Sequence, residues 1–212
     1  MLTLIKREIE DHIAYFAGAA VISAILVLRL IYIGYNFDND NLSLVDTFFP
    51  TGFFYAILIV LGLCIMGKSQ MSVDRNKKIS AFLSTLPVSR RRILAARIIA
   101  GLLTILIALV PPAITAQFLL NTFKPPYPVY PYFTIEILSS LFLTTFAIYC
   151  IGLMSGFSTN KIAAVIGVIL SFVFLTLILI KGCGLQSSVI LLLFIAASLI
   201  YTWKKFMKIP LI

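Results

Sequence analysis

One segment of the chain has the residue types and the spacing that could bind a nucleotide phosphate. Residues 62–69 read GLCIMGKS, a glycine and four further residues followed by Gly-Lys-Ser, which is the spacing of a phosphate-binding loop. Such a loop works when a strand leads into a glycine-rich turn whose backbone N–H groups surround a phosphate. Here the spacer residues are apolar, the preceding run is apolar enough to span a membrane, and Lys68 falls where an interfacial cation is expected. We therefore expect this chain not to bind ATP.

Side chains that could carry out catalysis or hold a metal are otherwise sparse. The single histidine, His12, and the three cysteines, Cys64, Cys150 and Cys183, lack the spacing of a metal site. The cysteines are expected to be small buried apolar residues. The central parts of the apolar runs contain no Asp, Glu, His or Lys, whereas an intramembrane enzyme or an ion-coupled carrier needs ionisable groups there. We predict no catalytic, cofactor-binding or metal-ligating residue, and therefore no enzyme.

The elements that must position any functional residue are membrane helices. Of 212 residues, 61% are apolar and 12% are charged, with a mean hydropathy of +1.07, whereas an average soluble domain is about 25% charged. This composition excludes a soluble enzyme, a disordered chain and a disulfide-rich secreted domain. The sequence predicts an all-α polytopic membrane protein whose single transmembrane domain, residues 1–212, has six transmembrane helices. The expected spans are Ile13–Ile33, Phe48–Gly67, Ile98–Leu120, Phe133–Gly156, Ile162–Ile180 and Ser187–Trp203.

The basic residues predict how these spans are oriented. Of the 17 Lys and Arg residues, all but Arg29, Lys124 and Lys181 fall at one set of span ends. Because basic residues concentrate in short cytoplasmic loops, both termini are expected in the cytoplasm and the chain in the plasma (inner) membrane. The net charge of +9 is then mainly a topology signal. Nucleic acid is not an expected partner, and the lipid bilayer is.

The N-terminal residues 1–12 have the pattern of a helix that lies at the membrane surface. Apolar residues recur at spacings of three and four and form one stripe, while charged residues point elsewhere. The stripe consists of Leu2, Ile5, Ile9, Ile13 and Phe16. An interfacial helix places such a stripe among the lipid headgroups. The alternative is a simple extension of the first span into water.

The loop over residues 68–97 is the longest expected on the cytoplasmic side. Within it Ile79, Phe82, Leu83 and Leu86 share one face of a two-turn helix. Pro87 ends that helix because proline disfavours helical geometry in the residue before it. Ser89 is then an N-cap for a helix that starts at Arg90. A short helix with exposed apolar residues and a basic rim is suited to docking on a partner; the alternative is that it rests on lipid headgroups.

This loop, together with the predicted topology, resembles the permease subunits of type-2 ATP-binding-cassette (ABC) transporters. The matching residues are Asp74, Arg75, Phe82, Leu83, Thr85, Leu86, Pro87, Val88, Ser89, Arg90, Ile93, Leu94 and Arg97. The family more often has Glu at the position of Asp74 and Lys at that of Arg97. The resemblance implies that the loop contains a coupling helix, which docks on a separate ATPase subunit carrying ATP and Mg. It also implies two ATPase subunits and a second permease copy, or a close homologue, as partners. The ATPase interface expected from it comprises Asp74, Arg75, Ile79, Phe82, Leu83, Leu86, Pro87 and Arg90.

Two features within the spans could serve transport. Pro111 and Pro112 are expected to kink the third span, and the carbonyls that they free could line a pathway with Thr115 and Gln117. A purely structural kink is the alternative. The pair Gly152 and Gly156, in a Gly-x-x-x-Gly spacing, could make a close helix contact within one chain or between two chains.

The function expected from these features is that of a permease subunit of an ABC exporter. It would couple ATP hydrolysis on its partner to export of an amphipathic or hydrophobic substrate, such as a peptide, an antibiotic or a lipid-like molecule. Two alternatives stay open. One is the substrate-binding membrane component of a vitamin importer, and the other is a non-transporting membrane sensor or immunity protein.

Overall fold

The described part of the chain forms six α-helices and no β-strand. The computed structural model describes residues 2–36, 44–76, 89–123, 133–157, 169–170, 173 and 185–208. The helices are α1 (Leu2–Asp11), α2 (Ile13–Asn36), α3 (Leu44–Asn76), α5 (Arg90–Phe123), α6 (Phe133–Gly156) and α8 (Leu185–Lys208). The prediction of an all-α chain is confirmed for these residues.

Four of these helices are long and apolar enough to cross a membrane, as expected for a membrane protein. Their apolar segments are Ile13–Gly34, Arg90–Leu119, Leu138–Gly156 and Ser187–Met207. The predicted second span, Phe48–Gly67, lies within the 33 residues of α3, where a shorter apolar stretch covers Ile57–Ser72. The predicted fifth span, Ile162–Ile180, lies outside the described residues except at 169–170 and 173.

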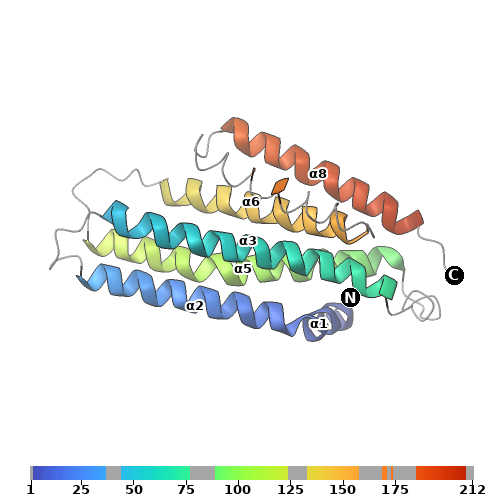
Figure 1. Cartoon of the computed structure of the whole chain (residues 1–212), viewed down its shortest axis with the longest axis horizontal. Coiled ribbons are helices and arrows are strands. Elements are labelled where there is room, and N and C mark those ends of the chain that lie inside the picture. Colours follow the sequence, from blue (N-terminus) through green and yellow to red (C-terminus); the bar gives the residue numbers. More distant parts are fainter. Residues whose placement is uncertain are drawn as a thin grey trace.

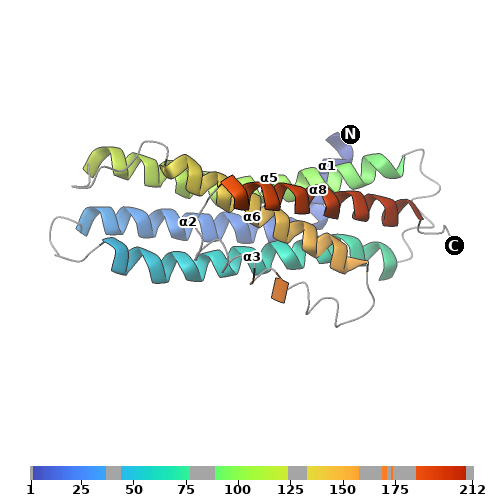
Figure 2. The same cartoon turned by 90° about the horizontal axis from the view of Figure 1, so that it is seen from above.

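The five long helices lie side by side along a common axis, and α1 runs across one end of them (Figures 1 and 2). Helix α2 packs mainly along α5, α3 mainly along α6, and α8 against α6. The last turns of α3, α6 and α8 and the first turn of α5 lie at the end where α1 lies, which we call the α1 end. A turn at His12 separates α1 from α2, so the two are distinct helices and not one straight extended span.

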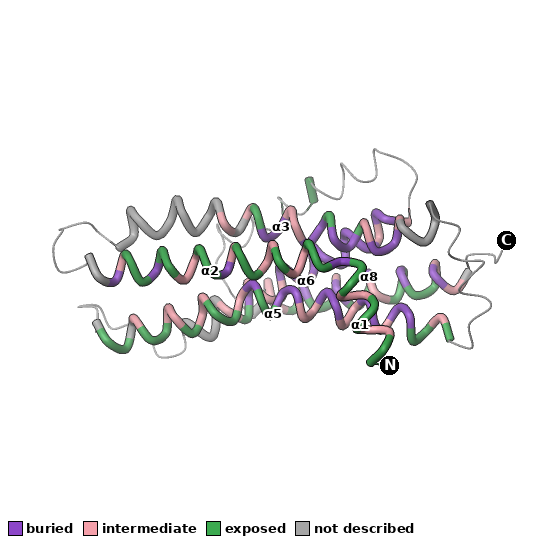
Figure 3. The backbone as a smooth tube through the Cα atoms, turned by 90° about the horizontal axis from the view of Figure 1, so that it is seen from below, coloured by how far each residue is buried: buried purple, intermediate pink, exposed green. Residues whose placement is uncertain are grey.

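Among the residues whose burial is described, the buried ones are concentrated in the half of the bundle near the α1 end (Figure 3). The main core includes Leu63 and Met71 of α3, Leu94 and Ile105 of α5, and Tyr149 of α6. Only 6% of the apolar segment of α2 is buried, against 61% of that of α6. Helix α6 is therefore the centre of the described bundle, and α2 lies at its edge.

Glycines bring α3 and α6 into close contact. A Cβ atom on Gly152 would lie 2.5 Å from the Cys64 carbonyl oxygen, and one on Gly156 would lie 2.8 Å from that of Lys68. From the other side, a Cβ on Gly67 would lie 2.7 Å from the Tyr149 carbonyl oxygen. The Gly152–Gly156 pair thus makes a helix contact within one chain, which was one of the two expected uses of this spacing.

The helix before the predicted coupling helix extends further than the sequence indicated, and the helix after it begins where the sequence predicted. Helix α3 continues to Asn76 because Gln70 and Met71 are buried against neighbouring helices. Helix α5 begins at Arg90, as predicted, and the Ser89 carbonyl accepts a hydrogen bond from the Arg92 N–H at 2.9 Å. Much of the expected loop 68–97 is therefore helical and continuous with α3 and α5.

Candidate functional site

The nucleotide-binding pattern at residues 62–69 lies inside the continuous helix α3. Its backbone therefore has helical geometry in place of the turn between a strand and a helix that a phosphate-binding loop requires. Gly67, its second glycine, faces the backbone of α6, while the Lys68 side chain is exposed. Gly67 therefore allows α3 to pack closely against α6.

The most polar feature of the described interior is a group of five side chains near the α1 end. Glu8 and His12 come from α1 and the turn after it, Gln70 from α3, Arg97 from α5, and Tyr149 from α6. We call these five residues the α1-end cluster. They join four helices that are far apart in the sequence, so the cluster fixes how those helices meet.

An ion pair between α1 and α5 forms one half of the cluster. The Arg97 Nε donates to Glu8 Oε1 at 3.2 Å, and the side chains of Arg97 and Glu8 are only 6% and 14% exposed. The guanidinium also lies 3.7 Å from the Met71 sulfur and 5.8 Å from the centre of the Phe206 ring. Removing one partner from a buried ion pair typically costs about 3–5 kcal/mol, because the other charge is left uncompensated. This pair therefore holds α1 against the bundle.

His12 lies beside this ion pair. Its Nε2 is 3.8 Å from Glu8 Oε2, and its ring is 5.9 Å from that of Tyr15. Burial lowers the pKa of His12 below its ordinary value of 6.5, and the positive charge of Arg97 adds to that effect, while Glu8 and Asp11 oppose it. His12 is therefore neutral near pH 7, and the charge of Glu8 is balanced by Arg97.

Tyr149 forms the other half of the cluster. Its hydroxyl donates to the Arg97 carbonyl oxygen at 2.9 Å and lies 2.6 Å from the Gln70 side-chain oxygen. A phenol has one proton, so both contacts are satisfied together when the Gln70 amide is turned to present its N–H to the phenol oxygen. The Tyr149 ring packs directly on Gly101, whose missing Cβ makes room for it. Since Tyr149 is fully buried and Gln70 is 1% exposed, water does not replace these contacts.

Only part of the predicted ATPase interface falls within the described residues. Asp74 and Arg75 are in the last turn of α3 and Arg90 is in the first turn of α5. An Arg90 guanidinium nitrogen donates to the Met207 carbonyl oxygen at 3.4 Å, which ties the start of α5 to the end of α8. The other predicted interface residues, Ile79, Phe82, Leu83, Leu86 and Pro87, lie outside the described residues.

The polar side chains among the four predicted pathway residues make hydrogen bonds within α5. Helix α5 passes through Pro111 and Pro112 without ending. The Thr115 hydroxyl donates to the Pro111 carbonyl oxygen at 2.9 Å, and the Gln117 amide donates to Asn121 Oδ1 at 3.5 Å. Pro111 and Gln117 are exposed. Both hydrogen bonds therefore join residues of α5 itself, and the pathway lining stays a prediction.

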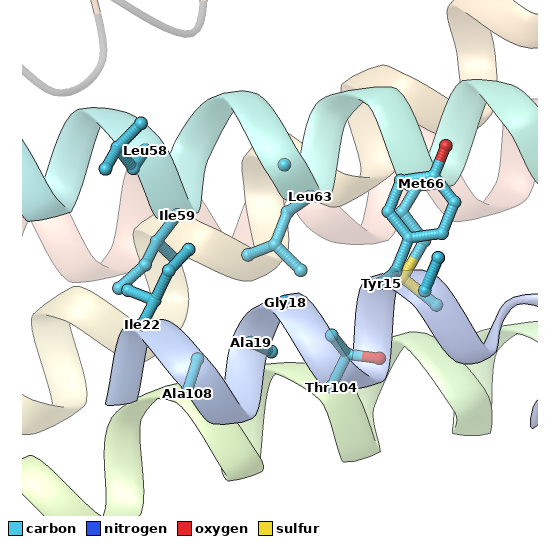
Figure 4. A pocket seen from close by; sticks show the side chains of 12 residues that line it. Tyr15, Gly18, Ala19, Ile22, Leu58, Ile59, Leu63, Met66, Thr104 and Ala108 are labelled. Atoms are coloured by element: carbon cyan, nitrogen blue, oxygen red, sulfur yellow. The ribbon is translucent and has the colours of Figure 1, made fainter. Parts of the chain in front are cut away.

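An apolar crevice of about 120 Å³ lies between α2, α3 and α5 (Figure 4). Figure 4 shows Tyr15 reaching from α2 toward α3 beside Met66 at one end of the crevice. Of the residues that line it, only Tyr15 and Thr104 carry a polar side-chain group. The complete lining is Ala14, Tyr15, Gly18, Ala19, Ile22, Leu58, Ile59, Gly62, Leu63, Met66, Thr104 and Ala108.

Reasoning from the sequence missed Glu8, Gln70 and Tyr149 as a functional group. Gln70 and Tyr149 could have been noticed in the sequence, since each places a polar side chain in an otherwise apolar helix. Arg97 was identified only through the family resemblance. Periodicity within one helix does not say which helices face each other, so these residues could not be brought together from the sequence.

Among the described residues, no group of three or more His, Cys, Asp or Glu side chains is arranged to hold a metal ion. The chemistry available in the α1-end cluster is therefore hydrogen bonding and charge pairing between helices, and that of the crevice is apolar contact. Comparison with protein-family models, with curated proteins and with solved structures gives no match to this chain.

Proposed function

We propose that this chain is the membrane-spanning permease subunit of an ABC exporter, acting as a dimer with two separate ATPase subunits. ATP would be hydrolysed on those partners, and this chain would supply the pathway for an amphipathic or hydrophobic substrate. The proposal rests on the residues around Thr85–Arg90 that resemble type-2 permeases and on the geometry of the helices at both sides of them.

A six-span topology is part of the proposal, and the directions of α6 and α8 support it. Phe157, just after α6, contacts Phe206 near the end of α8, with 6.4 Å between ring centres. Ala147 and Cys150, earlier in α6, pack against Leu191 and Ile195, earlier in α8. The two helices therefore run parallel, so the chain has to return across the bundle between them. A crossing at Ile162–Ile180 would provide this return.

The structural observation that supports a coupling role is the position of the α1-end cluster. Gln70 lies less than two turns before the end of α3 at Asn76, and Arg97 lies about two turns after the start of α5 at Arg90. The proposed coupling helix, Ile79–Leu86, connects these two helix ends in the sequence. The cluster then binds both helices to α1 and α6 through buried polar contacts.

This arrangement suggests how movement of an ATPase subunit would reach the spans. A displacement of the coupling helix would be applied to the ends of α3 and α5. Because these helices share the buried contacts of Tyr149, they would move together with α6 and not bend separately. Packed cores favour such rigid-body steps over continuous deformation. The spans would switch as blocks between inward-facing and outward-facing states.

Co-purification with an ABC ATPase, encoded beside this chain, tests the proposal. The intact chain should retain the ATPase and show hydrolysis that substrate stimulates. The double variant Phe82→Ala with Leu83→Ala should lose the ATPase, because it removes two apolar anchors from one helix face. Tyr149→Phe should keep the ATPase bound and lose much of the substrate stimulation, because the variant changes the connection to α6 and not the docking face.

Lys68→Ala is the matched control, since this side chain is exposed on α3 and belongs to neither group. It should behave like the original chain in both measurements. If the double alanine variant co-purified with its ATPase and transported normally, the coupling role would be wrong. A chain that binds a cytoplasmic partner without any ATPase would instead favour the sensor or immunity alternative.

A further inference from the structure

The crevice between α2, α3 and α5 has a size and shape that suit one hydrocarbon chain. Its volume is about 120 Å³, a little less than the apolar cavity of about 150 Å³ that accommodates benzene in another protein. Its α2 wall runs from Ala14 to Ile22, which is about 12 Å at the helical rise of 1.5 Å per residue. A space of this volume that extends this far along α2 admits a segment of an alkyl chain.

The lining of the crevice offers almost nothing but apolar contact. The Thr104 hydroxyl donates to the Ala100 carbonyl oxygen of its own helix at 3.0 Å, so it is already satisfied. A Cβ atom on Gly18 or on Gly62 would meet no atom within 4 Å, which shows that both glycines face open space. In this respect they differ from Gly67, whose Cβ would meet the backbone of α6. An apolar space of this kind gains dispersion contacts when a hydrocarbon fills it.

The position of the crevice within α2 places it beside one leaflet of a bilayer. Ile22 lies nine residues into α2, or about 14 Å from its start, which is roughly half of a hydrocarbon core of about 30 Å. Helices α2 and α3 contact each other little, so the crevice opens between them. What surrounds an opening at this depth is hydrocarbon and not water.

The charged side chains of α1, the helix that precedes α2, are paired within the chain. Lys6 lies 3.9 Å from Glu10, Arg7 lies 3.7 Å from Asp11, and Glu8 pairs with Arg97. No net charge of α1 is therefore left over to select an anionic or a cationic headgroup. Recognition at this position should depend on the chain of a lipid and not on its headgroup.

We propose that this crevice binds one acyl chain of a phospholipid from the leaflet at the α1 end. The bound chain separates α2 from α3 while each keeps its main partner, α5 or α6. This inference requires only that α2, α3 and α5 cross the membrane. It does not require an ATPase, so it and the proposed function can fail independently.

Photocrosslinking with phospholipids that carry a diazirine on one acyl chain tests the proposal. The full chain is reconstituted with a trace of labelled phosphatidylethanolamine or phosphatidylglycerol, and the adducts are mapped by mass spectrometry. Adducts are expected on crevice residues such as Gly18 and Met66, and they should saturate at one chain per protein. The two headgroups should label the crevice within about twofold of each other, because the charges of α1 are paired.

Filling the crevice should remove these adducts. Gly62→Leu and Gly18→Leu place a side chain into the open space from opposite walls, and each should lower crevice labelling by about tenfold, equivalent to about 1.4 kcal/mol of binding free energy. Ala20→Leu is the matched control on the exposed surface of α2 and should change nothing. Labelling of the exposed residue Val21 by bulk lipid should stay constant in all variants.

Three results would overturn the proposal. One is crevice labelling that does not saturate and that neither glycine variant reduces, which would mean contact with bulk lipid only. Another is an amount of crevice labelling that depends on the headgroup and that neither glycine substitution lowers. The third is crosslinking of the crevice residues to a second copy of the chain in place of lipid. Whether crevice labelling of the unmodified chain saturates at one lipid chain per protein tests the proposal even if one variant fails to fold.

Discussion

Removing the hydroxyl of Tyr149 should weaken the bundle by an amount that the geometry allows us to estimate. Tyr149→Phe keeps the ring on Gly101 but removes the contacts to Gln70 at 2.6 Å and to the Arg97 carbonyl at 2.9 Å. Hydrogen bonds between membrane helices contribute about 0.6 kcal/mol on average and about 1.7 kcal/mol at most. A buried amide left without a partner adds a penalty of about 1–3 kcal/mol. We therefore expect a loss of about 2 kcal/mol in the free energy of unfolding.

A double-mutant cycle separates these two contributions. Gln70→Leu replaces the buried amide with an apolar side chain, and the phenol can still donate to the Arg97 carbonyl. In the combined variant, Tyr149→Phe with Gln70→Leu, no side-chain amide is left unsatisfied. The combined variant should therefore be less destabilised than the sum of the two single variants, by about 1 kcal/mol.

The measurement is reversible unfolding of the purified chain by SDS in mixed micelles, followed by circular dichroism. Tyr201→Phe is the matched control, because Tyr201 is exposed and its hydroxyl lies 3.4 Å from Lys205. It should change the free energy of unfolding by less than about 0.5 kcal/mol. A cost of Tyr149→Phe as small as that of the control, or strict additivity in the cycle, would refute the reasoning about the cluster.

Three further outcomes are expected. In a chain whose own cysteines are replaced by serine, Asn41→Cys should react with an impermeant maleimide from outside, and labelling from the cytoplasmic side alone would contradict the predicted orientation. Lys68→Ala should leave ATP binding by the assembled complex unchanged, as measured by a fluorescent nucleotide, whereas loss of binding in an intact assembly would revive the phosphate-loop interpretation. Because burial lowers the pKa of His12 below 6.5, the unfolded chain takes up a proton first, and the free energy of unfolding should fall as the pH drops from about 7.5 to about 5.5. His12→Gln should make that dependence flatter in the same SDS titration, and an equal slope in both chains would contradict this role.

The boundaries of the helices could be predicted from the sequence where local signals decide them. Ser89 and Arg90 mark the start of α5 because capping depends on neighbouring residues. Helix α5 continues through Pro111 and Pro112 to Phe123, so these prolines mark no helix boundary. Helix α3 exceeded its predicted end at Gly67 because burial of Gln70 against Tyr149 is a contact between distant segments.

The α1-end cluster could not be predicted for a different reason. Its contacts join residues that are 89 positions apart for Glu8 and Arg97, and 79 apart for Gln70 and Tyr149. The apolar stripe of α1 indicates a surface helix but not that Glu8, beside the stripe, meets an arginine of α5. The crevice could not be predicted from the sequence either, because Gly18 and Gly62 have the same residue type as Gly67. They differ from Gly67 only in what packs opposite them.

The pairing of the helices has a consequence for how the chain is synthesised. Helix α2 packs on α5, and α3 packs on α6, so neither pair is adjacent in the sequence. At a synthesis rate of about 5–20 residues per second, the first two long helices wait several seconds in the bilayer before their partners emerge. During that time Gly67, which later fits against α6, faces lipid or foreign helices. Chains interrupted before Phe133 should therefore be trapped as mispaired species, and their clearance by membrane proteases should be faster than that of complete chains.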